Sequence, residues 1–268
     1  MIPEAADKLE RFFSGFADGA KPLLLLDYDG TLAPFRVDRF KARPWAGVRE
    51  LLQRIQNQGW TRMAVVTGRP AAEVAPLLVL DPPLEVWGLH GAERLYPGGL
   101  RRLQPISKAA GQKLDEVRQH LWRDSLGGLF ENKPNAAVMH WRGASPHKAK
   151  LIEQRARELF EPLARIDGLA LLEFEAGVEL RVGRDKGGAV EEIVEEASVA
   201  GLRVGPLAYL GDDLTDEAAF QAVNSFGARG LSVMVRRQWR ETVAAIWLRP
   251  PDELREFLRR WIKAAARE

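Results

Sequence analysis

Short apolar runs alternate with amphipathic segments over the first part of the chain. The apolar runs lie at residues 22–26, 62–66 and 85–89. An uninterrupted run of this length is typical of a strand buried on both faces of a parallel sheet. Apolar residues at helical spacing predict helices at residues 4–16, 44–59 and 71–78. Strands that alternate with helices predict an α/β unit whose parallel sheet is covered on both faces.

The pattern changes after about residue 96. Helices are predicted at residues 106–121 and 149–160, among stretches in which apolar and polar residues alternate. These alternating stretches are residues 129–131, 136–141, 169–174 and 178–182. Alternation of this kind is typical of an antiparallel sheet with one face on helices. We therefore expect an inserted α+β domain over residues 96–185.

The first pattern returns at residue 186. Strands at residues 207–210 and 231–235 alternate with helices at 187–200, from 216 onward and at 251–265. The predicted core domain is therefore discontinuous. It comprises residues 1–95 and 186–268, with the inserted domain between its halves.

Composition narrows the classes of function. The 268 residues include 39 basic and 37 acidic side chains, a balance that gives no reason to expect nucleic acid or a membrane as partner. The absence of cysteine excludes disulfides and thiolate sites. No apolar run approaches the ~20 residues that span a bilayer, and the amino terminus lacks a signal-peptide pattern. We expect a cytoplasmic protein.

Polar motifs follow three of the predicted core strands. They are Asp27-Tyr28-Asp29, Thr67-Gly68-Arg69 and Gly211-Asp212-Asp213, with Asp216 close behind. The carboxyl ends of parallel strands meet at one edge of the sheet, where ligands bind. Clustered carboxylates there favour a hard divalent cation such as Mg²⁺, and a carboxylate can attack phosphorus. Taken alone, each Asp-Gly pair could equally be a turn.

Four motifs in this order resemble those of the haloacid-dehalogenase-like (HAD) phosphatases. They are Leu26–Leu32, Thr67, Lys186 and Gly211–Glu217. More narrowly, the chain resembles the trehalose-6-phosphate phosphatases. That resemblance lies in residues 27–35, 88–93, 131–134 and 140–142. It implies a Rossmann-like core with a parallel sheet and an inserted α+β cap of the C2B type.

The resemblance also implies roles at the catalytic centre. Asp27 would be the nucleophile that becomes phosphorylated. Asp29 would protonate the leaving oxygen and then activate water. Thr67 and the Gly68 amide would hold phosphate oxygens, and Lys186 would balance their charge. Taken alone, Thr67 would be a helix N-cap and Lys186 a solvated lysine.

Metal ligands are implied in the same way. Mg²⁺ would be bound by the Asp27 carboxylate, the Asp29 backbone carbonyl and Asp212. Asp216 would be a further ligand or would support one. Arg69 could bind the substrate phosphate or pair with a carboxylate, or it could be a surface arginine.

Substrate recognition is implied for the cap. The matching residues are Glu131, Lys133 and Glu179, with His90 and Glu93 on the connection to the cap as further contacts. A site that binds hydroxyl groups needs several such hydrogen-bonding side chains. Taken without the resemblance, Glu131 and Lys133 favour an exposed cross-strand ion pair.

The activity implied is Mg²⁺-dependent hydrolysis of trehalose 6-phosphate through an aspartyl-phosphate. The catalytic motifs would equally suit sucrose phosphate, mannosyl-3-phosphoglycerate or a hexose phosphate, because they contact only phosphate. A phosphomutase or a regulatory protein that binds a sugar phosphate without turnover are further alternatives. We expect a monomer, with a trehalose-6-phosphate synthase left open as a docking partner.

Overall fold

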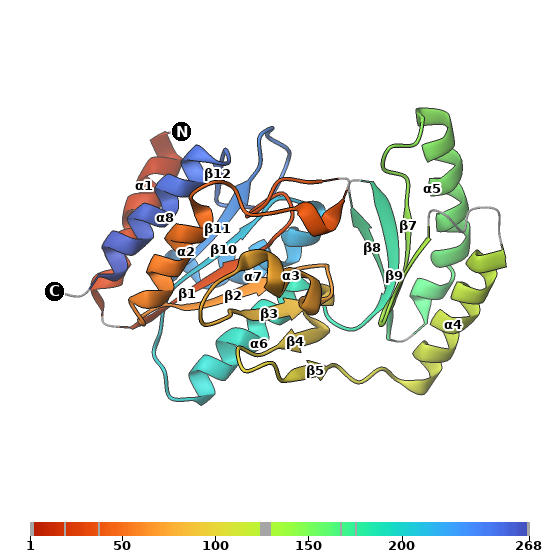
Figure 1. Ribbon diagram of the computed structural model, residues 1–268, viewed down its shortest axis with the longest axis horizontal. Coiled ribbons are helices and arrows are strands. Elements are labelled where there is room, and N and C mark those ends of the chain that lie inside the picture. Colours follow the sequence, from red (N-terminus) through yellow and green to blue (C-terminus); the bar gives the residue numbers. More distant parts are fainter. Residues whose placement is uncertain are drawn as a thin grey trace. The chain divides into compact units, whose positions relative to one another are not determined.

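The chain folds into two compact units. The computed structural model describes residues 3–18, 20–36, 38–123, 130–166, 168–174 and 176–266. The core unit comprises Met1–Arg102, Asp185–Asp212 and Asp216–Glu268. The inserted unit comprises Leu103–Arg184 and Asp213–Thr215. Both are drawn in Figure 1.

The core unit contains an eight-stranded sheet in the order β12-β11-β10-β1-β2-β3-β4-β5. The strands are β1 (Lys21–Leu26), β2 (Arg62–Val66), β3 (Glu85–Gly88), β4 (Glu93–Leu95), β5 (Arg101–Leu103), β10 (Val204–Gly211), β11 (Gly230–Val235) and β12 (Ile246–Leu248). Neighbours from β12 to β3 are parallel, whereas β4 is antiparallel to β3. The predicted parallel sheet is thus confirmed, with a short antiparallel extension.

Strands β1 and β10 form the centre of this sheet. Leu26 of β1 lies opposite Leu210 of β10 in a parallel register. Both strands are almost entirely buried, as expected for apolar runs covered on two faces. The register brings the segments that follow each strand, Asp27 and Asp212, to the same edge of the sheet.

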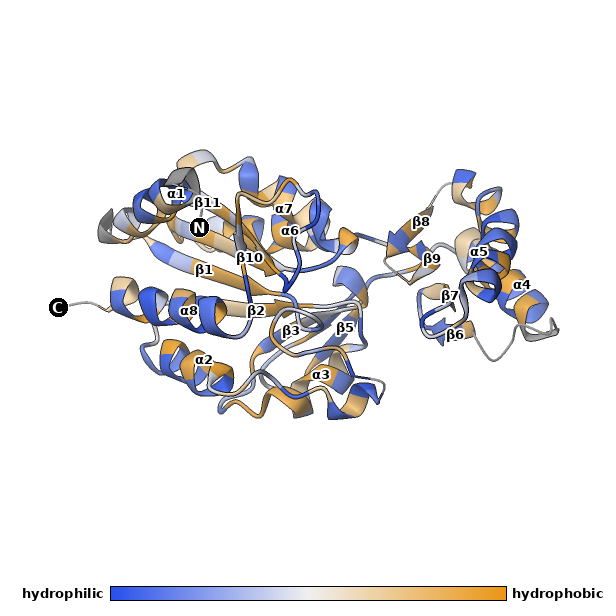
Figure 2. Ribbon diagram, turned by 90° about the horizontal axis from the view of Figure 1, so that it is seen from above, coloured by the Kyte–Doolittle hydropathy of each residue, from blue (hydrophilic) through white to orange (hydrophobic). Residues whose placement is uncertain are grey.

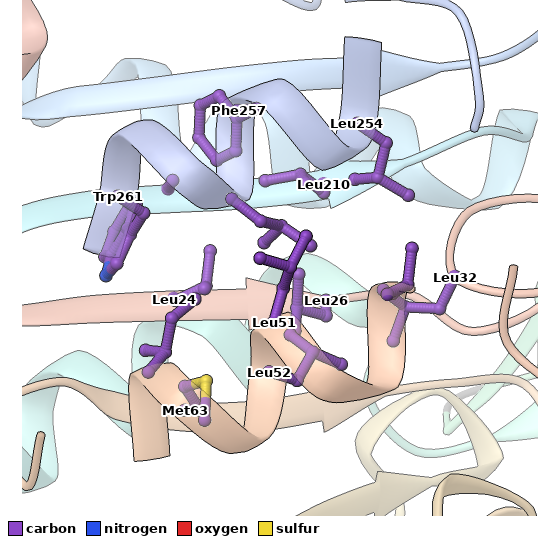
Figure 3. Packing of buried hydrophobic residues seen from close by; sticks show 14 of the residues in the cluster. Leu24, Leu26, Leu32, Leu51, Leu52, Met63, Leu210, Leu254, Phe257 and Trp261 are labelled. Carbon is purple, nitrogen blue, oxygen red and sulfur yellow. The ribbon is translucent and has the colours of Figure 1, made fainter. Parts of the chain in front are cut away.

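Helices cover both faces of the core sheet (Figure 1). One layer consists of α1 (Pro3–Ser14), α2 (Val48–Asn57), α3 (Ala71–Leu78) and α8 (Asp252–Ala265). The other consists of α6 (Lys186–Val199) and α7 (Glu217–Asn224). Figure 3 shows apolar residues of the first layer meeting the strands, among them Leu51, Phe257 and Leu26. Alternate residues of the parallel strands thus belong to two separate apolar clusters.

The helices of the first layer are amphipathic. Figure 2 shows hydrophilic and hydrophobic residues together on α2 and α8, whereas the last four residues of β1 are all leucine. Short 3-10 helices join these elements. Their bounds are η1 (Gly15–Asp18), η2 (Arg39–Lys41), η3 (Leu89–Gly91), η6 (Leu214–Asp216) and η7 (Gly227–Arg229).

The inserted unit contains a four-stranded sheet in the order β6-β7-β9-β8. Its strands are β6 (Phe130–Lys133), β7 (Ala136–His140), β8 (Leu169–Phe174) and β9 (Gly177–Val182), and every adjacent pair is antiparallel. Helices α4 (Lys108–Arg123) and α5 (Pro146–Phe160) pack on one face, and η5 (Leu163–Arg165) follows α5. The predicted α+β insert is confirmed. Leu129, the first residue of one predicted strand, lies outside the described residues.

Three strands were not predicted from the sequence: β4, β5 and β12. Each has only three residues, too few to establish an alternating or apolar pattern. All residues of β5 are exposed, which is typical of a short, charged edge strand. In the part of the chain that the structure describes, no helix has the length and apolarity needed to cross a bilayer.

The core of the inserted unit can be tested with two neighbouring residues of α5. Ile152 is fully buried, whereas Leu151 is 54% exposed. We expect Ile152→Ala to lower the free energy of unfolding by about 2–5 kcal/mol, because it leaves a cavity. Leu151→Ala should change it by no more than about 0.5 kcal/mol. Urea unfolding measures both, and equal losses would contradict the packing described.

Candidate active site

Asp27 lies directly after β1 and is buried. Its backbone N–H donates to the Leu210 carbonyl (2.8 Å), which continues the pairing of β1 with β10. Its side chain is only 5% exposed. Lys186 Nζ donates to Oδ1 of Asp27 at 2.6 Å, and Thr31 Oγ1 donates to Oδ2 at 3.4 Å. Asp27 is therefore fixed by contacts with both of its carboxylate oxygens.

Lys186 is the first residue of α6, and its side chain is buried. Asp185 caps this helix, because its carboxylate accepts from the Gly188 N–H at 2.9 Å. The Lys186 ammonium lies 2.6 Å from Asp27 and 2.7 Å from Asp216. The reading of Lys186 as a solvated lysine is therefore wrong.

Asp216 has no exposed surface and accepts hydrogen bonds through both carboxylate oxygens. Oδ1 accepts from Lys186 Nζ (2.7 Å) and from the Tyr209 hydroxyl (2.6 Å). Oδ2 accepts from the Asp212 N–H at 2.9 Å. Asp216 thus orients both the lysine and the backbone of Asp212.

Three buried carboxylates could hold a metal ion. Asp27, Asp212 and Asp216 each offer an oxygen, and these oxygens all lie within 4.8 Å of one another. One lysine ammonium cannot balance three carboxylates at this separation. A hard divalent cation would balance their charge, because such ions prefer carboxylate oxygens as ligands. The donor set therefore fits the predicted metal.

The loop after β1 closely approaches Asp212. Gly30 has a φ of +80°, which favours glycine. A Cβ at this position would lie 1.9 Å from Oδ2 of Asp212. Only glycine therefore allows the first motif to reach the fourth.

Burial dominates the electrostatics of the centre. Burial raises the pKa of Asp27 from 3.8 to about 7, although Lys186 opposes this shift. Burial lowers the pKa of Lys186, but Asp216 and Asp27 outweigh it and raise that pKa above its usual value. The lysine stays an ammonium. Burial and the neighbouring Asp216 also raise the pKa of Tyr209, so its hydroxyl stays a hydrogen-bond donor.

The Asp29 side chain is directed to Arg69. The Arg69 guanidinium donates to both carboxylate oxygens, with Nε 2.6 Å from Oδ2 and Nη2 on Oδ1. Its Nη1 donates to the Arg39 carbonyl at 2.7 Å. Of the three interpretations of Arg69, the structure therefore shows the carboxylate partner.

Thr67 and Gly68 form the turn after β2. The Thr67 N–H donates to the Trp87 carbonyl (2.8 Å), and Thr67 Oγ1 accepts from the Arg69 N–H (3.2 Å). Thr67 is therefore not the N-cap of α3, a position held by Pro70. A Cβ on Gly68 would lie 2.6 Å from the His90 ring, so the ring packs directly over this glycine.

Glu93 has a structural role in the core unit. Its Oε2 accepts from the N–H of Ala71, the first residue of α3, at 2.7 Å. Its Oε1 accepts from Arg101, and the side chain has no exposed surface. Both oxygens of Glu93 thus have partners within the core unit. The contact of Glu93 with a substrate stays a prediction.

In the inserted unit, the predicted recognition residues share one face of the sheet. Register places Glu131, Lys133 and Glu179 on the face opposite α4 and α5. Lys133 Nζ lies 2.8 Å from Oε2 of Glu179, and both side chains are largely buried. Glu131 lies 2.8 Å from His140 of β7. The Lys133 ammonium is thus held in a largely buried ion pair between strands rather than in an exposed one.

Some residues of these two sites were missed from the sequence. Tyr209, which supports Asp216, lies in an apolar strand and was interpreted as core. A phenol buried two residues before Gly211 needs a polar partner, and that need was the available indication. Thr31 and His140, which contact Asp27 and Glu131, lie within matching motifs but were given no role of their own.

Comparison with known proteins gives consistent matches. A sequence model of the trehalose-phosphatase family matches residues 25–245. Trehalose-phosphate phosphatases of Mycolicibacterium paratuberculosis and Mycobacterium marinum are 30% and 32% identical over 97% and 96% of this chain. The chain spans 66% and 65% of those two proteins. The C. albicans trehalose-6-phosphate phosphatase C-terminal domain shares the fold, with a TM-score of 0.78, 21% identity and 96% coverage of both chains.

The burial of Asp27 predicts how stability varies with pH. A carboxyl whose pKa is raised by folding opposes folding progressively as pH rises from the unfolded value to the folded one. In metal-free protein, we expect Asp27→Asn to gain stability relative to wild type between pH 3.8 and about 7 and then to level off. Urea unfolding across this range measures the difference. The control is Asp252→Asn, since Asp252 is 81% exposed, and a flat profile for Asp27→Asn would refute the assignment.

Proposed function

Because the chain belongs to the trehalose-phosphatase family, we propose that it hydrolyses trehalose 6-phosphate to trehalose and phosphate. One observation carries the proposal. Asp27 is buried 2.6 Å from Lys186, within a cluster that includes Asp212 and Asp216. Such a cluster supplies a carboxylate nucleophile, a cation for the phosphoryl group and a metal site together.

The reaction has two steps. An oxygen of Asp27 attacks phosphorus while the bond from phosphorus to the sugar oxygen breaks. The leaving oxygen keeps that electron pair and takes a proton from Asp29. Water then attacks the aspartyl-phosphate, Asp29 accepts the water proton, and the bond from Asp27 to phosphorus breaks. Phosphate is released and the enzyme is restored.

We propose Mg²⁺ as the cation. Asp27, Asp212 and the Asp29 backbone carbonyl would hold it, while Asp216 orients Asp212. When bound, it supplies positive charge that offsets the carboxylates and the phosphoryl oxygens. The buried donor set of oxygens supports this choice.

The remaining residues would bind the substrate. Thr67 and the Gly68 amide would hold phosphate oxygens, together with Lys186, and His90 would contact the substrate beside Gly68. We infer that the inserted unit, predicted over residues 96–185, acts as the cap. Its polar sheet face supports this inference, because hydroxyl groups are recognised by such hydrogen-bonding side chains. Those side chains are Glu131, Lys133 and Glu179.

A substrate panel tests the activity directly. Phosphate release should be fastest from trehalose 6-phosphate among trehalose, sucrose and hexose phosphates, and should stop when a chelator removes the cation. Asp27→Asn should lose at least roughly 10³-fold in rate, because it removes the nucleophile.

Controls define the outcome of this panel. Asp252→Asn is the matched control, because it makes the same change on the surface, and it should keep its rate. Preference for another sugar phosphate would overturn the substrate. Activity in folded Asp27→Asn would overturn the nucleophile. Phosphate binding without release would favour the regulatory alternative.

Lys133 tests the recognition surface. Lys133→Gln should lower kcat/KM for trehalose 6-phosphate by about 10- to 10³-fold, since the sugar loses a charged donor. Hydrolysis of p-nitrophenyl phosphate should stay within about threefold, because that ester has no sugar hydroxyls to bind. Lys148→Gln, at an exposed residue of α5, is the matched control. Equal losses on both esters would argue against a role in sugar recognition.

A further inference from the structure

We propose that Arg69 is a positioning residue that fixes the Asp29 carboxyl group for proton transfer. The inference rests on the proposed function, in which Asp29 is the acid and base. Arg69 and Asp29 lie 40 positions apart in the chain, at the ends of β2 and β1. The two strands are adjacent and parallel, so both side chains start from the same edge of the sheet.

The contact constrains both position and rotation of the carboxyl group. Nε and Nη2 of Arg69 each donate to a different oxygen of Asp29. Two parallel hydrogen bonds from a planar guanidinium fix the plane of the carboxylate as well as its distance. The Asp29 side chain is 24% exposed, so without this partner it would be free to rotate into solvent.

The guanidinium is itself held firmly. It is 9% exposed, and its Nη1 donates to the Arg39 carbonyl at 2.7 Å. Its centre lies 5.6 Å from the centroid of the Tyr28 ring, within cation–π range. Tyr28 is fully buried, and its hydroxyl donates to the Ala42 carbonyl at 2.5 Å. The Arg69 side chain is therefore held in place by the protein, whereas the Asp29 side chain that it binds is more exposed.

This geometry is less suited to binding phosphate directly. All three guanidinium nitrogens already donate to protein oxygens, two of them on Asp29. The protein itself therefore sets the orientation of the Asp29 carboxyl group.

The test compares two esters that differ in their need for an acid. Trehalose 6-phosphate has an alkoxide leaving group that must be protonated, whereas p-nitrophenyl phosphate releases a stable phenolate. We expect Arg69→Gln to lower kcat for the sugar ester by about 10²-fold with KM within about threefold. With the aryl ester, the burst of p-nitrophenolate that accompanies phosphorylation of Asp27 should keep its rate within about threefold, because this leaving group needs no acid. The later hydrolysis of the aspartyl-phosphate should slow, because Asp29 activates the water in that step. Arg69→Lys should recover part of the loss, because an ammonium can hold only one oxygen at a time.

A second background isolates the route through Asp29. In Asp29→Asn protein, adding Arg69→Gln should change kcat by less than about twofold, since the group that it positions is gone. Arg43→Gln is the matched control, because Arg43 donates to the Pro76 carbonyl from the same loop region as Arg39. Circular dichroism and urea unfolding establish that each variant is folded.

The outcomes separate the two proposals. A KM that rises for both esters would assign Arg69 to phosphate binding and overturn the inference. A p-nitrophenolate burst that slows as much as turnover of the sugar ester, or additive losses in the Asp29→Asn background, would also overturn it while leaving the proposed function intact. Wild-type protein that releases no phosphate from either ester would overturn the proposed function, and this inference with it.

Discussion

The active centre depends on one ammonium group that is shared by two buried carboxylates. Lys186 lies within 2.7 Å of both Asp27 and Asp216, where water cannot screen their repulsion. Removing a partner from such a cluster leaves an uncompensated buried charge. The cluster therefore requires that α6 begin at residue 186, and Asp185 secures that start as the N-cap. A bound divalent cation would offset the negative charge of the carboxylates further, in addition to the Lys186 ammonium.

The residues around this cluster support it through specific contacts. Asp216 holds the lysine and the Asp212 backbone, and Tyr209 donates to Asp216 from within β10. Gly30 lets the first loop approach Asp212. None of these residues needs to touch substrate to matter. The chemistry of a few atoms thus depends on packing around the whole carboxyl edge of the sheet.

The sequence was sufficient for the fold class and for the segments that form the centre. Apolar runs predicted the long core strands, because strands buried on both faces leave a continuous pattern. The same reasoning could not predict β4, β5 or β12, because each has only three residues and is too short to show a hydrophobic pattern. Motifs at the ends of the strands indicated which residues lie close together, because the carboxyl ends of parallel strands form one edge of the sheet.

Pairings between distant residues were beyond the sequence. Nothing in the local pattern shows that Arg69 binds Asp29, or that Glu93 accepts from the first backbone N–H of α3. Such choices depend on side-chain direction and on which competing partner is nearer, both of which are set by tertiary packing. The buried position of Lys186 could not be predicted either, because a lysine at the start of a helix is ordinarily solvated.

The pairing of β1 with β10 has a consequence for how the protein is made. Strand β1 leaves the ribosome early, yet its partner at the centre of the sheet is among the later segments of the chain. Strand β1 and the loop that carries Asp27 therefore lack their β10 partner until the carboxyl-terminal part of the chain has been synthesised. Contacts so distant in sequence are slow to form and expose the growing chain to aggregation. The inserted unit, whose strands pair only with one another, faces no such delay.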